Sequence, residues 1–95
     1  MKVVLLRAAL DTIRSLSPET KRRIKKAVLA LGEDPVGEKR SQDIKKLVGH
    51  LDDRPVYRLR VGDWRIVYRI LESRVEVVRV FPRSEGYGWM ERSGF

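Results

Sequence analysis

The first third of the chain changes from an apolar run to helical patterns. Residues 2–6 are mostly apolar and rich in valine, which is typical of a short strand. From Ala9 onward, apolar residues recur at helical spacing through Ile13 and Leu16. This spacing predicts a first helix of about two to three turns that ends near Leu16.

A second helix is predicted to begin after Ser17, which suits the N-cap, with Pro18 at the first helical position. Its apolar stripe follows the i, i+3, i+4, i+7 pattern and consists of Ile24, Ala27, Val28 and Leu31. Gly32 suits the position after the helix, and Pro35 prevents its continuation. The first third should therefore be a strand followed by a helical hairpin.

Residues 36–54 are polar and interrupted, and they predict no defined element. The segment 43–55 would hold either a short turn of helix or an irregular crossing segment. It contains His50, the only histidine of the chain, which we interpret as structural.

The last part of the chain has the pattern of strands. Residues 56–61 and 64–71 are joined by Gly62-Asp63, a strong signal for a two-residue hairpin loop. A second turn is predicted at 72–74 and a third strand at 75–81, ended by Pro82. Residues 83–95 should form a partly ordered tail or a short terminal turn. These elements predict an α+β fold of one domain, 1–95, with the N-terminal strand and helical hairpin packed on a small, mainly antiparallel sheet.

The hairpin loop also predicts which side chains share a face of the sheet. Val61 should pair with Trp64, which places Arg60 opposite Arg65. The core face would carry Tyr57, Leu59, Val61, Trp64, Ile66, Tyr68 and Ile70, and the opposite face Val56, Arg58, Arg60, Arg65, Val67 and Arg69. In the third strand, Val78 and Val80 are assigned to the core. That assignment places Val77 and Arg79 on the same face as the arginines of the hairpin, and Glu76 on the core face.

We call the side that carries Arg58, Arg60, Arg65, Arg69 and Arg79 the arginine face. The chain has a formal net charge of +8, and such a charge attracts polyanions, of which nucleic acid is the commonest. Arginines on a solvated strand are ordinary, but a like-charged pair across strands costs stability. We therefore favour an anion-binding surface, since planar guanidinium groups fork onto phosphate and stack on bases.

A second basic group lies on the predicted second helix, away from its apolar stripe, and consists of Lys21, Arg22, Lys25 and Lys26. These residues would hold an RNA or DNA backbone. The alternative, a solvated basic helix face, is common and here is the stronger interpretation.

Composition narrows the chemistry further. The chain has no cysteine and one histidine, so it lacks the residues of thiolate or histidine metal sites, and we expect metal-independent chemistry without a cofactor. It has no asparagine and one glutamine, a depletion typical of thermophile proteins. No apolar run is long enough to cross a bilayer, and the N-terminus lacks a signal-peptide pattern, so we expect a cytoplasmic protein.

Two segments resemble a known superfamily. The stretches KKLVGHLDDRPVYRLRVGDWRIVYRI (45–70) and VEVVRVFPRSEGY (75–87) are similar to the RelE/ParE toxins of type II toxin–antitoxin systems. In the RelE branch the resemblance implies a ribosome-dependent endoribonuclease that cleaves the mRNA codon in the A site, through attack of the 2′-OH on the adjacent phosphate. By motif position it implies catalytic roles for Arg58, Arg60, Arg65, Arg83 and Tyr87. Arg69 and Arg79 are expected to bind nucleic acid because they lie on the arginine face.

Two departures from the RelE pattern leave the proton acceptor unassigned. The basic positions of the second strand of this pattern are often lysine, but here both are arginine, which is a poor general base. No histidine lies near the terminal motif, so Glu85 and Tyr87 are the only local candidates.

The resemblance leaves two other functions open and implies a set of partners. The alternatives are a ParE-type inhibitor of DNA gyrase and a catalytically decayed relative that only binds its antitoxin. The expected partners are a cognate antitoxin that wraps the toxin, in a possible heterotetramer, the ribosome with its mRNA, and operator DNA contacted through the antitoxin. No membrane partner is expected. If the arginines serve only phosphate binding, Arg65→Ala should leave the fold at least as stable.

Overall fold

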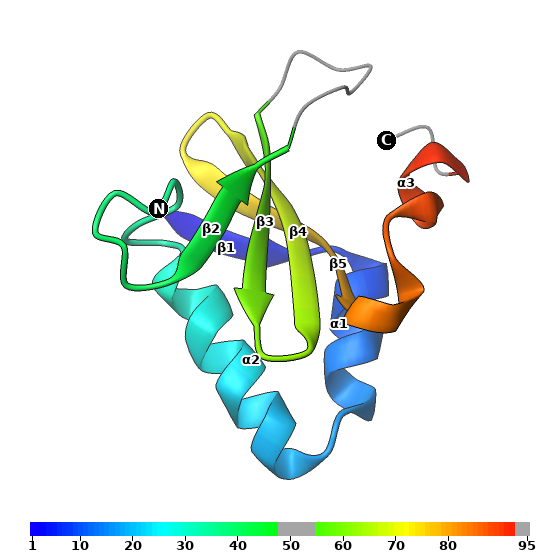
Figure 1. Cartoon of the computed structure of the whole chain (residues 1–95). Coiled ribbons are helices and arrows are strands. Elements are labelled where there is room, and N and C mark those ends of the chain that lie inside the picture. Colours follow the sequence, from blue (N-terminus) through cyan, green and yellow to red (C-terminus); the bar gives the residue numbers. More distant parts are fainter. Residues whose placement is uncertain (48–54, 93–95) are drawn as a thin grey trace.

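The structure, a computed structural model, describes residues 1–47 and 55–92. Its elements are β1 (Lys2–Leu5), α1 (Arg7–Ser15), α2 (Pro18–Ala30), β2 (Asp43–Lys46), β3 (Val56–Val61), β4 (Trp64–Leu71), β5 (Arg74–Pro82), the 3-10 turn η1 (Arg83–Glu85) and α3 (Gly88–Arg92). The five strands form one sheet in the order β1-β5-β4-β3-β2, in which only β1 and β5 run parallel (Figure 1). The predicted α+β fold is confirmed.

Helices α1 and α2 cover one face of the sheet and enclose the main core (Figure 1). The predicted stripe of α2 is confirmed, because Ile24, Ala27, Val28 and the following Leu31 are all buried in this core. Gly32 follows α2 for a reason other than backbone conformation. A Cβ at Gly32 would lie 2.6 Å from the Met1 carbonyl oxygen, because the N-terminus crosses there to start β1.

The β3–β4 hairpin has the predicted register. Val61 pairs with Trp64, and Arg60 pairs with Arg65. Gly62 has a φ of 57° while Asp63 has a negative φ, which is typical of a type II′ turn with glycine in its first central position. The hairpin therefore places the guanidinium-bearing side chains of β3 and β4 on one side of the sheet.

An irregularity in β5 overturns three of the predicted face assignments. Val67 pairs with Arg79 but the next residue, Tyr68, pairs with Val77, so Val78 is an extra residue in the ladder. Such a bulge exchanges the faces of all residues before it. The correction concerns three residues: Val77 is in the main core, Val78 packs on the opposite side, and Glu76 lies on the arginine face. The predicted sides of Val80 and Arg79 are consistent with their contacts.

The segment without a predicted element contains the edge strand β2, which pairs antiparallel with β3. A loop of residues 31–42 leads to it and is held by the buried hydroxyl of Tyr68, which donates to the Pro35 carbonyl oxygen at 2.5 Å. Burial above all, and then the nearby Tyr57 and Asp34, raises the pKa of this hydroxyl far above its usual value, so it remains a donor. His50 and its predicted structural role lie outside the described residues.

The C-terminal segment forms a second, smaller core on the other face of the sheet. There Trp89 and Met90 of α3 pack with Val56, Val67 and Phe81. The predicted short terminal turn is thus η1 followed by a short helix whose apolar side chains cover the middle of the arginine face. Within the described ranges, no helix is long and apolar enough to span a membrane.

Candidate nucleic-acid interface

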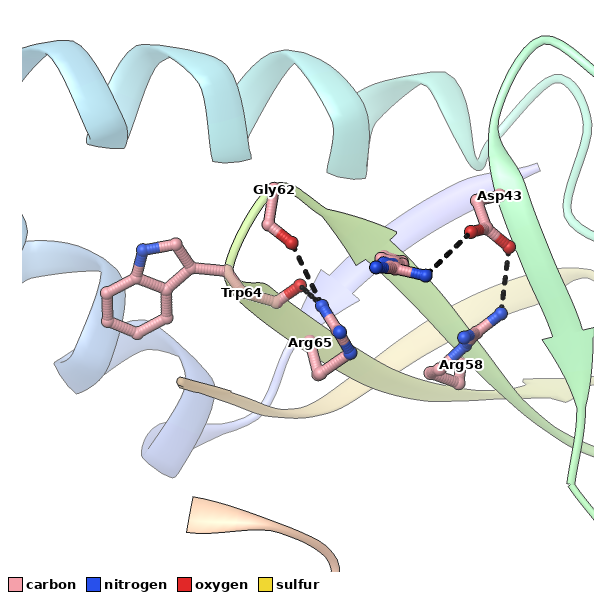
Figure 2. Close-up of polar contacts among 6 residues, drawn as sticks. Asp43, Arg58, Gly62, Trp64 and Arg65 are labelled. Carbon is pink, nitrogen blue, oxygen red and sulfur yellow. Dashed lines mark hydrogen bonds and ion pairs between the residues drawn. The ribbon is translucent and has the colours of Figure 1, made fainter. Parts of the chain in front are cut away.

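At the β2 edge of the arginine face, Asp43 binds two of the predicted catalytic arginines. Arg58 Nη2 donates to Asp43 Oδ1 at 2.9 Å, and Arg60 Nη1 lies 3.9 Å from Asp43 Oδ2 (Figure 2). The Arg60 side chain is 48% exposed, whereas that of Arg58 is 15% exposed. Arg60 is thus the more accessible of the two to a ligand, and Asp43 holds Arg58 in one orientation.

Arg65 is buried rather than solvated. Its residue exposure is 8%, and Arg65 Nη1 donates to the carbonyl oxygens of Gly62 at 3.0 Å and Trp64 at 3.1 Å (Figure 2). The guanidinium group therefore bridges the two ends of the hairpin turn. The expectation that Arg65→Ala would leave the fold as stable is revised, because the change would remove both of these hydrogen bonds.

Arg69 takes part in an ion-pair network at the other end of β4. Arg69 Nη2 lies 2.6 Å from Glu76 Oε1, and Arg74 Nη2 lies 3.5 Å from Glu76 Oε2. The Glu76 side chain is 9% exposed, so its charge depends on these two arginines for compensation. Arg69, which is predicted to bind nucleic acid, is thus paired with a carboxylate of the protein itself.

Arg79 is also engaged, by two residues of the C-terminal segment. Arg79 Nη2 lies 2.7 Å from Glu85 Oε1, and its guanidinium carbon lies 5.0 Å from the centre of the Trp89 ring. Because Glu85 is paired with a permanently charged arginine, it is a weak candidate for the proton acceptor. Tyr87, the other candidate, contacts Phe81 edge to face at 5.3 Å between ring centres and is 38% exposed.

Arg83 lies where β5 ends beside the hairpin turn. Its backbone N–H donates to the Asp63 carbonyl oxygen at 2.7 Å, and its side chain is exposed. An open pocket of about 450 Å³ is lined by Asp63, Pro82, Arg83 and Ser84. Within residues 1–47 and 55–92, the Arg83 guanidinium makes no hydrogen bond or ion pair, so its charge faces this pocket and solvent uncompensated.

The basic residues of α2 lie apart from the arginine face. Lys21, Arg22, Lys25 and Lys26 belong to a helix that packs on the opposite face of the sheet. Its Arg23 reaches the hairpin turn, because a Cβ at Gly62 would lie 3.1 Å from Arg23 Nη2. The structure therefore supports two separate basic surfaces, of which the one near Arg83 includes a pocket.

A family model described as the ParE toxin of type II toxin–antitoxin systems, parDE, matches residues 3–87. The chain belongs to this toxin family. Its fold is that of the solved RelE toxins. RelE in the archaeal RelE–RelB complex from Pyrococcus horikoshii OT3 is 27% identical, with a TM-score of 0.73 over 90% of this toxin and 97% of that chain.

Two further structures show the same fold at lower identity. A chain of the RelBE2 complex from Mycobacterium tuberculosis is 24% identical, with a TM-score of 0.69 over 86% of this toxin and 96% of that chain. The isolated RelE toxin of E. coli is 22% identical, with a TM-score of 0.68 over 97% and 93%. No curated protein sequence matches the toxin closely enough to count as a relative.

The sequence pattern of the toxin predicted the positions of most of the arginines on the arginine face, but not of the carboxylates that form ion pairs with them. Asp43 lies in a segment without a predicted strand, and Glu76 was assigned to the wrong face because of the bulge at Val78. The sequence pattern identifies Asp63 only as a turn residue. Its position between two strand signals, one residue before Trp64, was the available indication that it would lie at an exposed tip.

Proposed function

We propose that this toxin is a RelE-type endoribonuclease that cleaves mRNA in the A site of the ribosome. The observation that carries the proposal is that the exposed Arg83 lines the pocket, with the exposed Tyr87 four residues later. An uncompensated guanidinium beside a concave surface is suited to a phosphodiester, and an exposed aromatic ring is suited to an unstacked base. Arg83 and Tyr87 are also the residues that correspond to the Arg and Tyr of the terminal motif.

The chemistry requires charge stabilisation and alignment. Attack of a 2′-OH on the adjacent phosphate builds negative charge on the nonbridging oxygens, which a fixed guanidinium group stabilises. In-line attack also requires the base and sugar to be held in one geometry, which stacking on Tyr87 would favour. In this proposal Arg83 contacts the phosphate and Tyr87 orients the nucleotide.

The other predicted site residues receive narrower roles. Arg60, the more exposed member of the Asp43 pair, would contact the RNA backbone, with Arg58 beside it. Arg65 would act through the turn that it braces, as a positioning residue. Arg69 and Arg79 would support the fold under the site, while Lys21, Arg22, Lys25 and Lys26 would meet ribosomal RNA.

The proposed partners are a cognate antitoxin, the ribosome and its mRNA. The P. horikoshii and M. tuberculosis structures are complexes of toxin and antitoxin, which supports an antitoxin for this toxin also. A basic toxin surface suits a disordered acidic or amphipathic antitoxin segment that folds on binding. A heterotetramer that binds operator DNA through the antitoxin, and a cytoplasmic location, complete this proposal.

One alternative has an observation of its own. The matching family model is that of ParE, which favours inhibition of DNA gyrase without cleavage of RNA. A catalytically decayed toxin that only binds its antitoxin is the third reading. It would cause neither arrest of translation nor arrest of replication.

Primer extension on a defined mRNA, with and without programmed 70S ribosomes, tests the proposal. Cleavage within the A-site codon that requires ribosomes is the expected result. Arrest of DNA synthesis before protein synthesis in expressing cells, with intact mRNA, would establish the gyrase alternative instead.

A further inference from the structure

The proposed reaction needs a group that accepts the proton of the attacking 2′-OH, and the two sequence candidates are poorly suited to it. Glu85 is paired with Arg79, and the Tyr87 ring packs edge to face on Phe81. The following inference rests on the proposed function and assigns a further residue of the same site.

The carboxylates near the arginine face differ in whether they have cationic partners. Asp43 pairs with Arg58 and Arg60, Glu76 with Arg69 and Arg74, and Glu85 with Arg79. Asp63 is the exception, because its carboxylate makes no hydrogen bond or ion pair with any residue that the structure describes. It is exposed and lines the same pocket as Arg83.

The backbone that carries Asp63 is braced from two directions. Arg65 Nη1 donates to the carbonyl oxygens of Gly62 and Trp64, on either side of Asp63. The Arg83 N–H donates to the carbonyl oxygen of Asp63 itself. The two Arg65 bonds hold the turn together, and the Arg83 bond fixes the turn against the end of β5. The backbones of Asp63 and Arg83 are therefore held next to each other.

From this arrangement we infer that Asp63 is a catalytic residue, the general base that deprotonates the 2′-OH of the scissile nucleotide. The carboxylate takes this proton while the 2′-oxygen forms its bond to phosphorus. The bond from phosphorus to the 5′-oxygen breaks, and the 5′-oxygen takes a proton from water. The hydroxide left by that water receives the proton from Asp63, so the products are a 2′,3′-cyclic phosphate and a 5′-OH.

In this arrangement Arg83 and Asp63 have different roles in the reaction. Arg83 stabilises the charge that develops on the phosphate, and Asp63 moves the proton, which an arginine cannot do. A positioned general base contributes roughly 10²–10⁴-fold to a rate. Removing the Asp63 carboxylate should therefore lower the rate of cleavage without weakening RNA binding, since the change also removes a negative charge near the RNA.

The test is single-turnover cleavage on programmed ribosomes, with toxin binding to the same ribosomes measured in parallel. Asp63→Asn should lower the cleavage rate by about 100-fold or more, with binding unchanged or tighter. Glu33→Gln removes the same charge from an exposed residue after α2 that does not line the pocket, and it should cleave at the wild-type rate. Asp63→Glu should retain more activity than Asp63→Asn.

Chemical rescue separates a catalytic role from a structural one. Added formate should restore part of the cleavage by Asp63→Ala, because it supplies a carboxylate to the vacated space, and it should not rescue Arg83→Ala. Wild-type cleavage rates in Asp63→Asn, or loss of activity that tracks a lower melting temperature without rescue, would overturn the assignment while leaving the proposed function intact. Absence of cleavage by the wild-type toxin would overturn the proposed function and this inference together.

Discussion

The two ends of the arginine face use the same side chain in opposite ways. Near Leu71, the guanidinium groups of Arg69 and Arg74 converge on one carboxylate, Glu76, and form an ion-pair network. Near the hairpin turn, Arg83 has no such partner in the part of the chain that the structure describes. The number of arginines does not distinguish the two ends of the arginine face, but the positions of the paired carboxylates do.

The comparison shows that charge left without a partner marks the candidate site better than charge density does. A buried pair that satisfies itself has little to offer a ligand, because breaking it costs several kcal/mol. An exposed guanidinium at a pocket can contact a phosphate without first breaking an ion pair within the protein. We therefore expect substitutions at the hairpin end to affect activity and those at the network end to affect stability.

The largest expected effect is on activity, at Arg83. Arg83→Ala should lower cleavage of ribosome-bound mRNA by about 10²–10³-fold, because it removes the charge stabilisation of the developing oxyanion. Its melting temperature should remain near that of the wild type, since the exposed guanidinium makes no hydrogen bond or ion pair with residues 1–47 or 55–92. Arg74→Ala, which removes one exposed arginine at the other end, is the matched control and should keep at least a third of the activity. Equal losses of cleavage activity in Arg83→Ala and Arg74→Ala would contradict the proposed difference between the two ends of the arginine face.

At the network end, Glu76→Ala should destabilise the toxin by about 2–4 kcal/mol, because it leaves the partly buried Arg69 without its carboxylate. Urea denaturation measures this change. The double variant Glu76→Ala, Arg69→Met should recover part of the stability, since it also removes the partly buried cation that Glu76 binds. Full stability of Glu76→Ala alone would show that the ion pairs at Glu76 do not contribute to the stability of the fold.

At Arg65 we expect a substitution to affect both stability and activity. Arg65→Ala should lower the free energy of unfolding by about 1–3 kcal/mol, because it leaves the carbonyl oxygens of Gly62 and Trp64 without this donor. Cleavage should fall more than stability accounts for, as the turn loosens. Equilibrium unfolding and cleavage measured on the same preparation check both. A variant as stable as the wild type would restore the view that Arg65 serves phosphate binding alone.

The smallest expected effect is at Gly62. Gly62→Ala should cost about 1 kcal/mol, because its φ of 57° disfavours a side chain and the new Cβ would lie 3.1 Å from Arg23 Nη2. The thermal midpoint measures this loss. Repeating the measurement in Arg23→Ala should recover the steric part of the cost but not the backbone part.

The sequence predicted local structure well and long-range register less well. The helical stripe of α2 and the II′ hairpin depend on residues close together in the chain, so their patterns were sufficient to place Ile24, Leu59 and Tyr68 in the core. The bulge at Val78 is different, because it depends on how β5 meets β4, and no local signal in a run of valines marks the extra residue. Strand β2 was missed because an exposed edge strand needs no apolar alternation.

The candidate site shows the same division. Motif position found Arg83 and Tyr87, whose exposure follows from their place beyond the last strand. It did not show that Arg65 is buried, or that Arg69 and Arg79 are bound by Glu76 and Glu85, because these partners depend on the bulge and on the path of the C-terminal segment. The pocket joins residues 63 and 82–84, so only the folded chain defines it.

The parallel pairing of β1 with β5 sets the order in which the toxin can be completed during synthesis. Val3 pairs with Val75, so the first strand can find its neighbour only after β5 has been synthesised. The pocket wall contributed by Pro82, Arg83 and Ser84 is made later still. A nascent chain that has not yet reached β5 therefore lacks both the neighbour of β1 and this wall of the pocket, so the proposed site can form only after residue 84 has been added.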